Sequence, residues 1–354
     1  MILKPLVLRL GPVGFAKEAW HSLEKVANVV TLNEDATRES FLKELRDPNG
    51  KFSKVRVIAR TFDSAQQTGR FDREVAEALP SSVVGVCHLG AGYDQIDTTP
   101  LKERGIQVTH VPGAVNNATA DTHVFLLLGA LRNFSAGIKS LQKGDWPAKG
   151  HAGGAEWGHD PEGHVVGILG LGGIGRTIVD RLKPFGFKKF IYHNRRRVSP
   201  ELEKGCEYVS FDELLNQADI ISINIPLNSN TRHTINADAL AKMKDGVIIV
   251  NTARGGVIDE KALIESLKAG KVSNFAADVF EHEPEVPQEL KEMPQVLALP
   301  HMGTATVETA KHMEEFHVSN VESIIRTGKG RAVVPEIIDE EWLKDSKPLI
   351  NTPL

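Results

Sequence analysis

Short runs of apolar residues recur along the chain, separated by stretches with the spacing of amphipathic helices. The runs are rich in Val and Ile and are continuous rather than alternating, which is typical of strands buried on both faces. Helices alternating with such strands indicate an α/β protein whose parallel sheets are covered by helices. Ten runs are expected to form strands: Pro5–Leu10, Val55–Ala59, Val83–Cys87, Ile106–Val111, Val165–Leu169, Lys189–Tyr192, Ile220–Ile225, Val247–Val250, Phe275–Ala277 and Val296–Leu299.

The organisation of the chain changes around residues 116–133, where a strongly apolar helical pattern begins. Residues 144–163 are rich in Gly, His and Trp without a regular period, so we expect a long surface loop before a new strand. Near the other end, Val307–Thr327 has a helical pattern that stops at Gly328. We therefore expect a second domain to begin around the helix within residues 116–133, and the polar tail to pack on the first domain.

Length and composition agree with this reading and exclude several classes of protein. The 354 residues suggest about two domains, and 41% apolar with 25% charged residues is typical of a globular chain. The net charge of −4 provides no basic field for nucleic acid or an anionic membrane. The two cysteines, Cys87 and Cys206, lack metal-ligand spacing and favour a reducing compartment. We expect a cytoplasmic protein with no metal, nucleic-acid or membrane partner.

Two further segments bear on localisation. The apolar run Val124–Leu131 is much shorter than the roughly 18 residues that a membrane helix requires. The apolar N-terminal segment contains Lys4 and Arg9, so we interpret it as the first strand rather than a signal peptide.

A glycine-rich turn follows the expected strand Val165–Leu169. Gly170 permits a tight turn, Gly172 lets a pyrophosphate approach the backbone, and Gly175 lets the next helix pack on the strand. The helix N-terminus supplies N–H groups and partial positive charge for phosphates. Because a strand precedes the motif and a helix follows it, we predict a dinucleotide site that also includes Gly173 and Ile174.

The end of the next strand indicates which dinucleotide is bound. An acidic residue about 20 positions past the glycines would bind the ribose 2′-hydroxyl of NAD. This chain instead has His193, Asn194, Arg195, Arg196 and Arg197. Arginines can pair with a 2′-phosphate through forked hydrogen bonds, so we predict NADPH as the preferred cofactor and NADH as a possible one. The alternative is a solvated basic loop.

With these motifs the chain resembles the D-isomer-specific 2-hydroxyacid dehydrogenases over nearly its whole length. Within that family it is most similar to the fungal glyoxylate/hydroxypyruvate reductases. Besides the glycine turn, the resemblance rests on residues 90–97 (GAGYDQID), 250–255 (VNTARG), 278–284 (DVFEHEP) and 300–303 (PHMG).

The resemblance implies two Rossmann-like parallel-sheet domains, the cofactor domain inserted into a flavodoxin-like substrate domain. We place the substrate (catalytic) domain at residues 1–118 and 326–354, and the dinucleotide-binding domain at 119–325. The resemblance also implies a homodimer, and reduction of a small 2-oxoacid by hydride transfer with proton donation to the carbonyl oxygen. Glyoxylate and hydroxypyruvate are the favoured substrates.

Three residues are expected to carry this chemistry. Arg254 follows a buried strand, where its guanidinium can hold a carboxylate by a fork and polarise the adjacent carbonyl. His301 also follows a strand and is the expected proton donor. Glu283 is implied by the resemblance to pair with His301 and stabilise its charged form. The neighbouring His282 should point the other way in an extended segment.

Other positions receive binding roles. Ala91 and Gly92 lie in a glycine-rich turn whose N–H groups could bind the substrate carboxylate, together with Arg254 and His301. The resemblance implies that Asp278 binds the nicotinamide carboxamide. The remaining expected cofactor contacts are Pro226 and Leu227 beside the adenine, Thr252 and Ala253 beside the nicotinamide ribose, and Gly303.

The same residues are compatible with two other functions. An aryl 2-oxoacid reductase or D-mandelate dehydrogenase would have the same residues with a different substrate pocket. A dinucleotide-sensing, corepressor-like binding protein would also retain them without turnover. Formate dehydrogenase carries Gln where Glu283 stands here, which favours the hydroxyacid interpretation.

Overall fold

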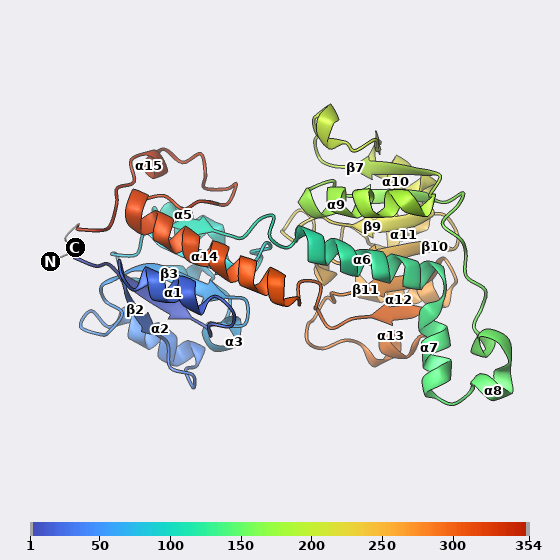
Figure 1. The fold of residues 1–354 in the computed structure, drawn as a ribbon, viewed down its shortest axis with the longest axis horizontal. Helices are drawn as coiled ribbons and strands as arrows, with labels where there is room; N and C mark the ends of the chain where they lie inside the picture. Colours follow the sequence, from blue (N-terminus) through green and yellow to red (C-terminus); the bar gives the residue numbers. More distant parts are fainter. Residues whose placement is uncertain (1–2, 352–354) are drawn as a thin grey trace. The chain divides into compact units, whose positions relative to one another are not determined.

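The computed structural model describes residues 3–351, which divide into two compact units. The first unit contains the described residues up to Val115 and those from Thr306 onward, and the second unit is Asn116–Ala305. Each unit is built around its own sheet of parallel strands (Figure 1). The α/β class with two parallel-sheet domains is therefore confirmed.

The sheet of the first unit has five strands in the order β2-β1-β3-β4-β5, the flavodoxin-like order. Its elements are β1 Leu6–Leu10, α1 Lys17–Leu23, β2 Asn28–Thr31, α2 Arg38–Arg46, β3 Val55–Thr61, α3 Ala65–Thr68, α4 Arg73–Ala78, β4 Gly85–Leu89, α5 Thr98–Glu103, β5 Gln107–Thr109, α14 Val307–Thr327 and α15 Glu341–Lys344.

Successive residues of these strands enter opposite hydrophobic cores. Val7 packs with Trp20 of α1 and Ile324 of α14 on one face of the sheet. Its neighbour Leu8 packs with Phe41 of α2 on the other face. Because side chains alternate across a strand, burial of both faces requires apolar residues at nearly every position, as the sequence has.

The sheet of the second unit has seven strands in the order β12-β11-β10-β9-β6-β7-β8. The six strands β6 to β11 have the order of the Rossmann fold, and β12 is one added strand at the edge beside β11. Its elements are α6 Asn116–Leu131, α7 Phe134–Gln142, α8 Trp146–Lys149, η1 His151–Gly154, β6 Val165–Leu169, α9 Gly173–Leu182, η2 Lys183–Phe185, β7 Lys189–His193, η3 Pro200–Leu202, β8 Glu207–Tyr208, α10 Phe211–Gln217, β9 Ile220–Ile223, α11 Ala237–Lys242, β10 Val247–Asn251, η4 Gly255–Val257, α12 Glu260–Lys268, β11 Val272–Ala277, α13 Gln288–Glu292 and β12 Val296–Ala298.

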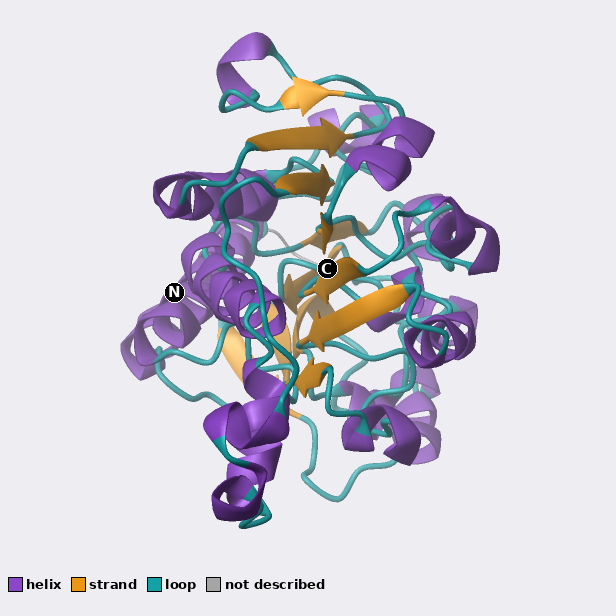
Figure 2. Cartoon of the chain, turned by 90° about the vertical axis from the view of Figure 1, so that its right-hand side faces the viewer, coloured by secondary structure: helices purple, strands orange, loops and turns teal. Residues whose placement is uncertain are grey.

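Helices cover both faces of this sheet (Figure 2). Helices α6 and α9 pack on one face, where Leu127 and Val179 share a hydrophobic core with Ile168. Helices α10, α11 and α12 pack on the other face, where Leu214 and Leu263 share a hydrophobic core with Ile249. Because the strands are parallel, the loops after β6, β9, β10, β11 and β12 all lie at one edge of the sheet. Ligands of such sheets bind outside the carboxyl ends of the strands, which is this edge.

All ten predicted strands are present, with ends that differ by a few residues. The two strands that the sequence pattern missed, β2 and β8, are edge strands whose residues are mostly half-buried or exposed. An edge strand lacks the apolar run that marks a strand covered on both faces. The predicted loop 144–163 is partly wrong, because it contains α8 and η1.

One expected domain boundary is also wrong. We placed residues up to 325 in the dinucleotide-binding domain, but the chain returns to the first unit at Thr306. The reason is that α14 buries Val318, Val321 and Ile324 against the first sheet. The first boundary along the chain was predicted after residue 118 and lies after Val115, because α6 begins at Asn116. The tail packs with the first unit, as predicted.

Among residues 3–351, no single helix combines the length and apolar character needed to cross a membrane. Helices α6 and α7 reach that threshold only as a joined pair, which is bent by 80°.

Candidate functional site

Three neighbouring strands of the second unit bring the expected catalytic residues to one edge. Strand β10 pairs with β11, and β11 pairs with β12, all in parallel. Arg254 follows β10, Glu283 lies in the segment after β11, and His301 follows β12. Because parallel strands end at the same edge, residues 47 positions apart in sequence become neighbours in space.

His301 and Glu283 form a hydrogen-bonded pair, with Nδ1 of the imidazole 2.6 Å from Oε2 of the carboxylate. The other carboxylate oxygen accepts the backbone N–H of Phe280 at 2.8 Å. Burial of Glu283 would raise its pKa, but these hydrogen bonds and the positive charge of Arg254 hold the pKa below its usual range. Glu283 is therefore a carboxylate at neutral pH.

Asp278 organises the loop that carries His301. Its carboxylate oxygens accept the backbone N–H groups of Met302 and Gly303, each at 2.7 Å, and its carbonyl accepts the N–H of His301 at 2.8 Å. These bonds hold His301 at φ 51°, in the left-handed region that non-glycine residues seldom adopt. Burial raises the pKa of Asp278. Its interactions with the loop were not predicted from the sequence.

Arg254 is placed by a close approach of two loops. Its Nη1 donates to the Ala253 carbonyl at 2.8 Å, and its charge contributes to the low pKa of Glu283. A Cβ at the next residue, Gly255, would overlap the backbone of Phe280. Glycine at this position therefore lets the loop of Arg254 lie directly against the loop of Glu283.

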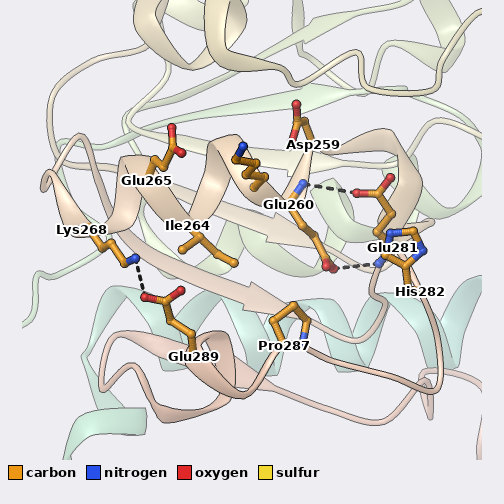
Figure 3. A pocket seen from close by; sticks show the side chains of 10 residues that line it. Asp259, Glu260, Ile264, Glu265, Lys268, Glu281, His282, Pro287 and Glu289 are labelled. Carbon is orange, nitrogen blue, oxygen red and sulfur yellow. Dashed lines mark hydrogen bonds and ion pairs between the residues drawn. The ribbon is translucent and has the colours of Figure 1, made fainter.

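A pocket of about 400 Å³ lies beside this loop and contains His282 (Figure 3). The Glu260 carboxylate accepts a hydrogen bond from the backbone N–H of Glu281 at 2.7 Å. The Glu281 carboxylate in turn accepts hydrogen bonds from the side chains of Arg232 and His233, at 2.6 Å each. Burial raises the pKa of Glu260. His282 lines this pocket, whereas the neighbouring Glu283 bonds His301, so the two side chains diverge as predicted. The expected extended segment is wrong, because the Glu285 N–H donates to the His282 carbonyl at 2.9 Å and closes a turn.

The glycine turn has the local geometry that a dinucleotide requires. Gly170 has φ 100°, and a Cβ at Gly175 would overlap the carbonyl oxygen of Gly170. Gly172 is exposed with open space where a Cβ would stand, at the N-terminus of the ten-residue helix α9. Gly173 and Ile174, in the first turn of that helix, contribute N–H groups without intrahelical acceptors. The turn can therefore receive a pyrophosphate.

Residues after β7 separate into structural and exposed groups. The Asn194 side chain accepts the Leu171 N–H at 2.7 Å, and His193 Nδ1 lies 2.9 Å from the Val209 carbonyl oxygen. Arg197 pairs with Glu203 at 2.6 Å. Arg195 and Arg196 are exposed, and within residues 3–351 neither has an acidic partner. These two guanidinium groups are therefore available to a ligand.

Thr252 is held by a buried residue that our sequence analysis did not assign. Its Oγ1 lies 2.8 Å from Nδ1 of His123 on α6, and Nε2 of that ring lies 2.8 Å from Ser222 Oγ. Burial lowers the pKa of His123 to about 3, so the ring is neutral. The sequence signal that could have identified His123 is a single histidine within the strongly apolar segment of α6.

The remaining expected contacts lie in loops at the ends of strands. Pro226 follows β9, and its carbonyl accepts the Thr231 hydroxyl at 2.6 Å. Leu227 reaches toward Gly256, in the turn after Arg254. Ala91 and Gly92 follow β4 in the first unit, with carbonyl oxygens 2.8 Å and 3.0 Å from ring nitrogens of His110 and His88. Among residues 3–351, no three His, Cys, Asp or Glu side chains are grouped to hold a metal ion.

Comparison with known proteins identifies the family of the chain. Residues 124–303 match the family model described as "D-isomer specific 2-hydroxyacid dehydrogenase, NAD binding domain". Glyoxylate reductase 1 of Saccharomyces cerevisiae is 59% identical over 347 residues, which cover 98% of this chain and 99% of that protein. The chain therefore belongs to the D-isomer-specific 2-hydroxyacid dehydrogenases, a family of oxidoreductases that use nicotinamide dinucleotides.

Solved structures give the same fold. A glyoxylate reductase from Paecilomyes thermophila has a TM-score of 0.89 at 46% identity, covering 94% of this chain and 99% of that one. The holo form of Rhodotorula graminis D-mandelate dehydrogenase has a TM-score of 0.87 at 31% identity, with coverages of 94% and 98%. An NADPH-dependent glyoxylate/hydroxypyruvate reductase from Sinorhizobium meliloti, in complex with NADP and malonate, has a TM-score of 0.80 at 28% identity, with coverages of 95% and 98%.

Proposed function

We propose that this chain reduces glyoxylate to glycolate, and also hydroxypyruvate, with NADPH preferred over NADH. The observation that carries the proposal is the 2.6 Å pair between His301 and Glu283, next to the charge of Arg254. A proton donor, a carboxylate that favours its charged form and a cationic anchor are what reduction of a 2-oxoacid requires from a protein. The names of the similar reductases support the choice of glyoxylate.

In the proposed mechanism each residue has one task. Arg254 binds the substrate carboxylate by a fork and polarises the adjacent carbonyl, with the N–H groups of Ala91 and Gly92 as further donors. The nicotinamide supplies a hydride to the carbonyl carbon when it is bound. His301 donates a proton to the carbonyl oxygen. Glu283 fixes the tautomer of His301 and stabilises its charged form.

The residues that would hold the dinucleotide lie in the glycine turn, at the end of β7 and in loops that follow other strands of the second unit. Gly170, Gly172, Gly173, Ile174 and Gly175 would bind the pyrophosphate, because open space at Gly172 meets the N-terminus of α9. The other proposed contacts are His193 and Asn194 beside the ribose, Pro226 and Leu227 beside the adenine, and Thr252, Ala253, Asp278 and Gly303 beside the nicotinamide half.

The test is NADPH oxidation by the wild-type protein over 2-oxoacids of increasing bulk, from glyoxylate and hydroxypyruvate to phenylglyoxylate. We expect turnover that is fastest with the small acids. His301→Asn should lower kcat by about 10²–10⁴-fold, the usual contribution of general acid catalysis. Arg254→Ala should raise KM for the oxoacid and lower kcat.

Each outcome separates the alternatives. Faster turnover of phenylglyoxylate would favour an aryl 2-oxoacid reductase. Tight dinucleotide binding without turnover of any 2-oxoacid would indicate a dinucleotide-sensing binding protein. Near-normal turnover by the His301 variant would remove its assignment as the proton donor.

The preference for NADPH rests on the exposed Arg195 and Arg196. Replacing both by alanine should raise KM for NADPH, because charge-assisted hydrogen bonds to the 2′-phosphate are lost. We expect this increase to be at least about ten times the increase in KM for NADH. Arg197→Ala is the matched control, because that guanidinium is held by Glu203. Equal effects of the double variant on both cofactors would contradict the phosphate assignment.

A further inference from the structure

The turn after β4 in the first unit has three successive carbonyl groups that all accept hydrogen bonds. The Gly90 oxygen accepts the Val111 N–H at 2.8 Å. The Ala91 oxygen lies 2.8 Å from Nδ1 of His110, and the Gly92 oxygen lies 3.0 Å from Nε2 of His88. Every carbonyl of this short segment is therefore fixed, by the backbone just after β5 or by a histidine side chain.

Fixing the carbonyls also fixes the N–H groups. The C=O and N–H of a trans peptide unit point in opposite directions, and the peptide bonds of this segment are trans. The N–H groups of Ala91, Gly92 and Tyr93 are consequently directed away from the groups that hold the carbonyls. None of these three N–H groups has an acceptor within residues 3–351. Successive unpaired N–H groups form an anion-binding concavity.

The two histidines are suited to this task by chemistry and placement. A carbonyl oxygen only accepts hydrogen bonds, so His110 must carry its proton on Nδ1 and His88 on Nε2. The backbone of His110 is held by Ala332 and Asn320, at 3.1 Å and 3.0 Å. A Cβ at Gly90 would lie 2.7 Å from Nε2 of His88, so glycine there lets the buried ring reach beneath the turn.

We propose that His88 and His110 are positioning residues that orient the peptide units of this turn for the substrate carboxylate, and that the Tyr93 N–H is a third donor. Neither histidine touches the substrate in this scheme. Each acts by holding a carbonyl so that the N–H of the next residue faces the bound anion. The inference rests on the proposed reduction of a 2-oxoacid and deepens it by identifying what prepares the carboxylate site.

The experiment uses two pairs of variants that differ in a hydrogen-bond donor at nearly constant size. Asn places an amide nitrogen near the position of Nδ1, and Leu has the same shape without a donor, so His110→Asn is compared with His110→Leu. Gln and Met form the equivalent pair for His88. Because Leu and Met fill the space of the ring, the variants without a donor retain packing.

We expect KM for glyoxylate to rise about tenfold in His110→Leu and His88→Met, the usual effect of losing one hydrogen bond. KM for NADPH should stay near the wild-type value, and Asn and Gln should restore much of the glyoxylate KM. This split between substrate and cofactor is one that a general loss of folding would not produce. His312→Ala, at an exposed histidine of α14, is the control expected to behave like wild type.

The outcomes distinguish this inference from the proposed function. An active wild type whose glyoxylate KM is unchanged in both donor-free variants overturns the positioning role alone. Parallel increases in both KM values, without rescue by Asn or Gln, overturn it in favour of a structural role. A wild type inactive on every 2-oxoacid overturns the proposed function and this inference with it.

Discussion

Individual side chains in the second unit have protonation states that their surroundings set. Glu283 is held as a carboxylate by its hydrogen bonds and by Arg254. Burial has the opposite effect on Asp278 and Glu260, whose pKa values are raised. His123 is kept neutral by complete burial, with a pKa of about 3. Such differences at one edge of a sheet are typical of functional sites, and they also make stability depend on pH.

We predict that His123 makes unfolding pH-dependent. Its pKa is about 3 in the folded chain against 6.5 for an unperturbed histidine. Below about pH 6.5 the unfolded chain binds a proton that the folded chain refuses, so the free energy of unfolding decreases as the pH falls toward 3. The contribution approaches about 1.4 kcal/mol per pH unit.

Urea titrations between about pH 7 and pH 5 measure this slope. Glutamine cannot titrate, so His123→Gln should lower the slope of the free energy of unfolding against pH by the equivalent of about one proton. His312→Gln, at an exposed position, should leave that slope unchanged. Identical slopes for wild type and His123→Gln would contradict the prediction.

At the scale of elements, the candidate site depends on how closely the loops after β10, β11 and β12 approach one another. Asp278 joins the second loop to the third through three hydrogen bonds. Gly255 lets the first loop lie against the backbone of Phe280. Glu260 of α12 accepts the N–H of Glu281 and so holds the second loop from its other side.

We expect Gly255→Ala to separate the loops that carry Arg254 and Glu283, because the added methyl group would overlap the Phe280 backbone. A misplacement of about 1 Å in a catalytic geometry can cost about 10²-fold, so kcat/KM should fall by that order. Gly137→Ala is the control, since within residues 3–351 its added Cβ would meet no atom closer than 4 Å apart from its chain neighbours and its own helix backbone. Steady-state kinetics and thermal unfolding of both variants measure the effect, and wild-type kinetics in Gly255→Ala would refute the argument.

At the scale of the whole molecule, the second unit exposes several large apolar side chains on and around α6, α7 and α8. They are Phe125, Phe134, Ile138, Leu141, Trp146 and Trp157, all at least 45% exposed. Exposed apolar groups gathered on adjoining elements are typical of a protein interface. We propose that a second copy of this chain covers them in a homodimer, as the family resemblance implies.

Sedimentation equilibrium tests this proposal. The wild type should have the mass of a dimer, and Ile138→Glu with Leu141→Glu should shift it to the monomer, because burying unpaired carboxylates is unfavourable. Leu202→Glu, at an exposed leucine of η3, should leave the dimer intact. A monomeric wild type, or a dimer unaffected by the double substitution, would contradict this interface.

The sequence by itself determined the features that depend on local order along the chain. The apolar runs predicted ten strands, and the glycines of residues 170–175 predicted a turn between a strand and a helix. The motifs identified the family and placed Arg254, Glu283 and His301 after strands. These features were predictable because burial on both faces of a sheet, and backbone conformations that require glycine, leave direct traces in residue type.

Only the tertiary structure decided which elements pack together. It assigned α14 to the first unit, and it brought His123 to Thr252, Glu260 to Glu281, and His88 and His110 to the turn after β4. It also separated Arg197, which Glu203 holds, from the exposed Arg195 and Arg196. Hydrogen bonds between distant residues depend on strand order and side-chain direction, and neither is encoded in the local apolar pattern.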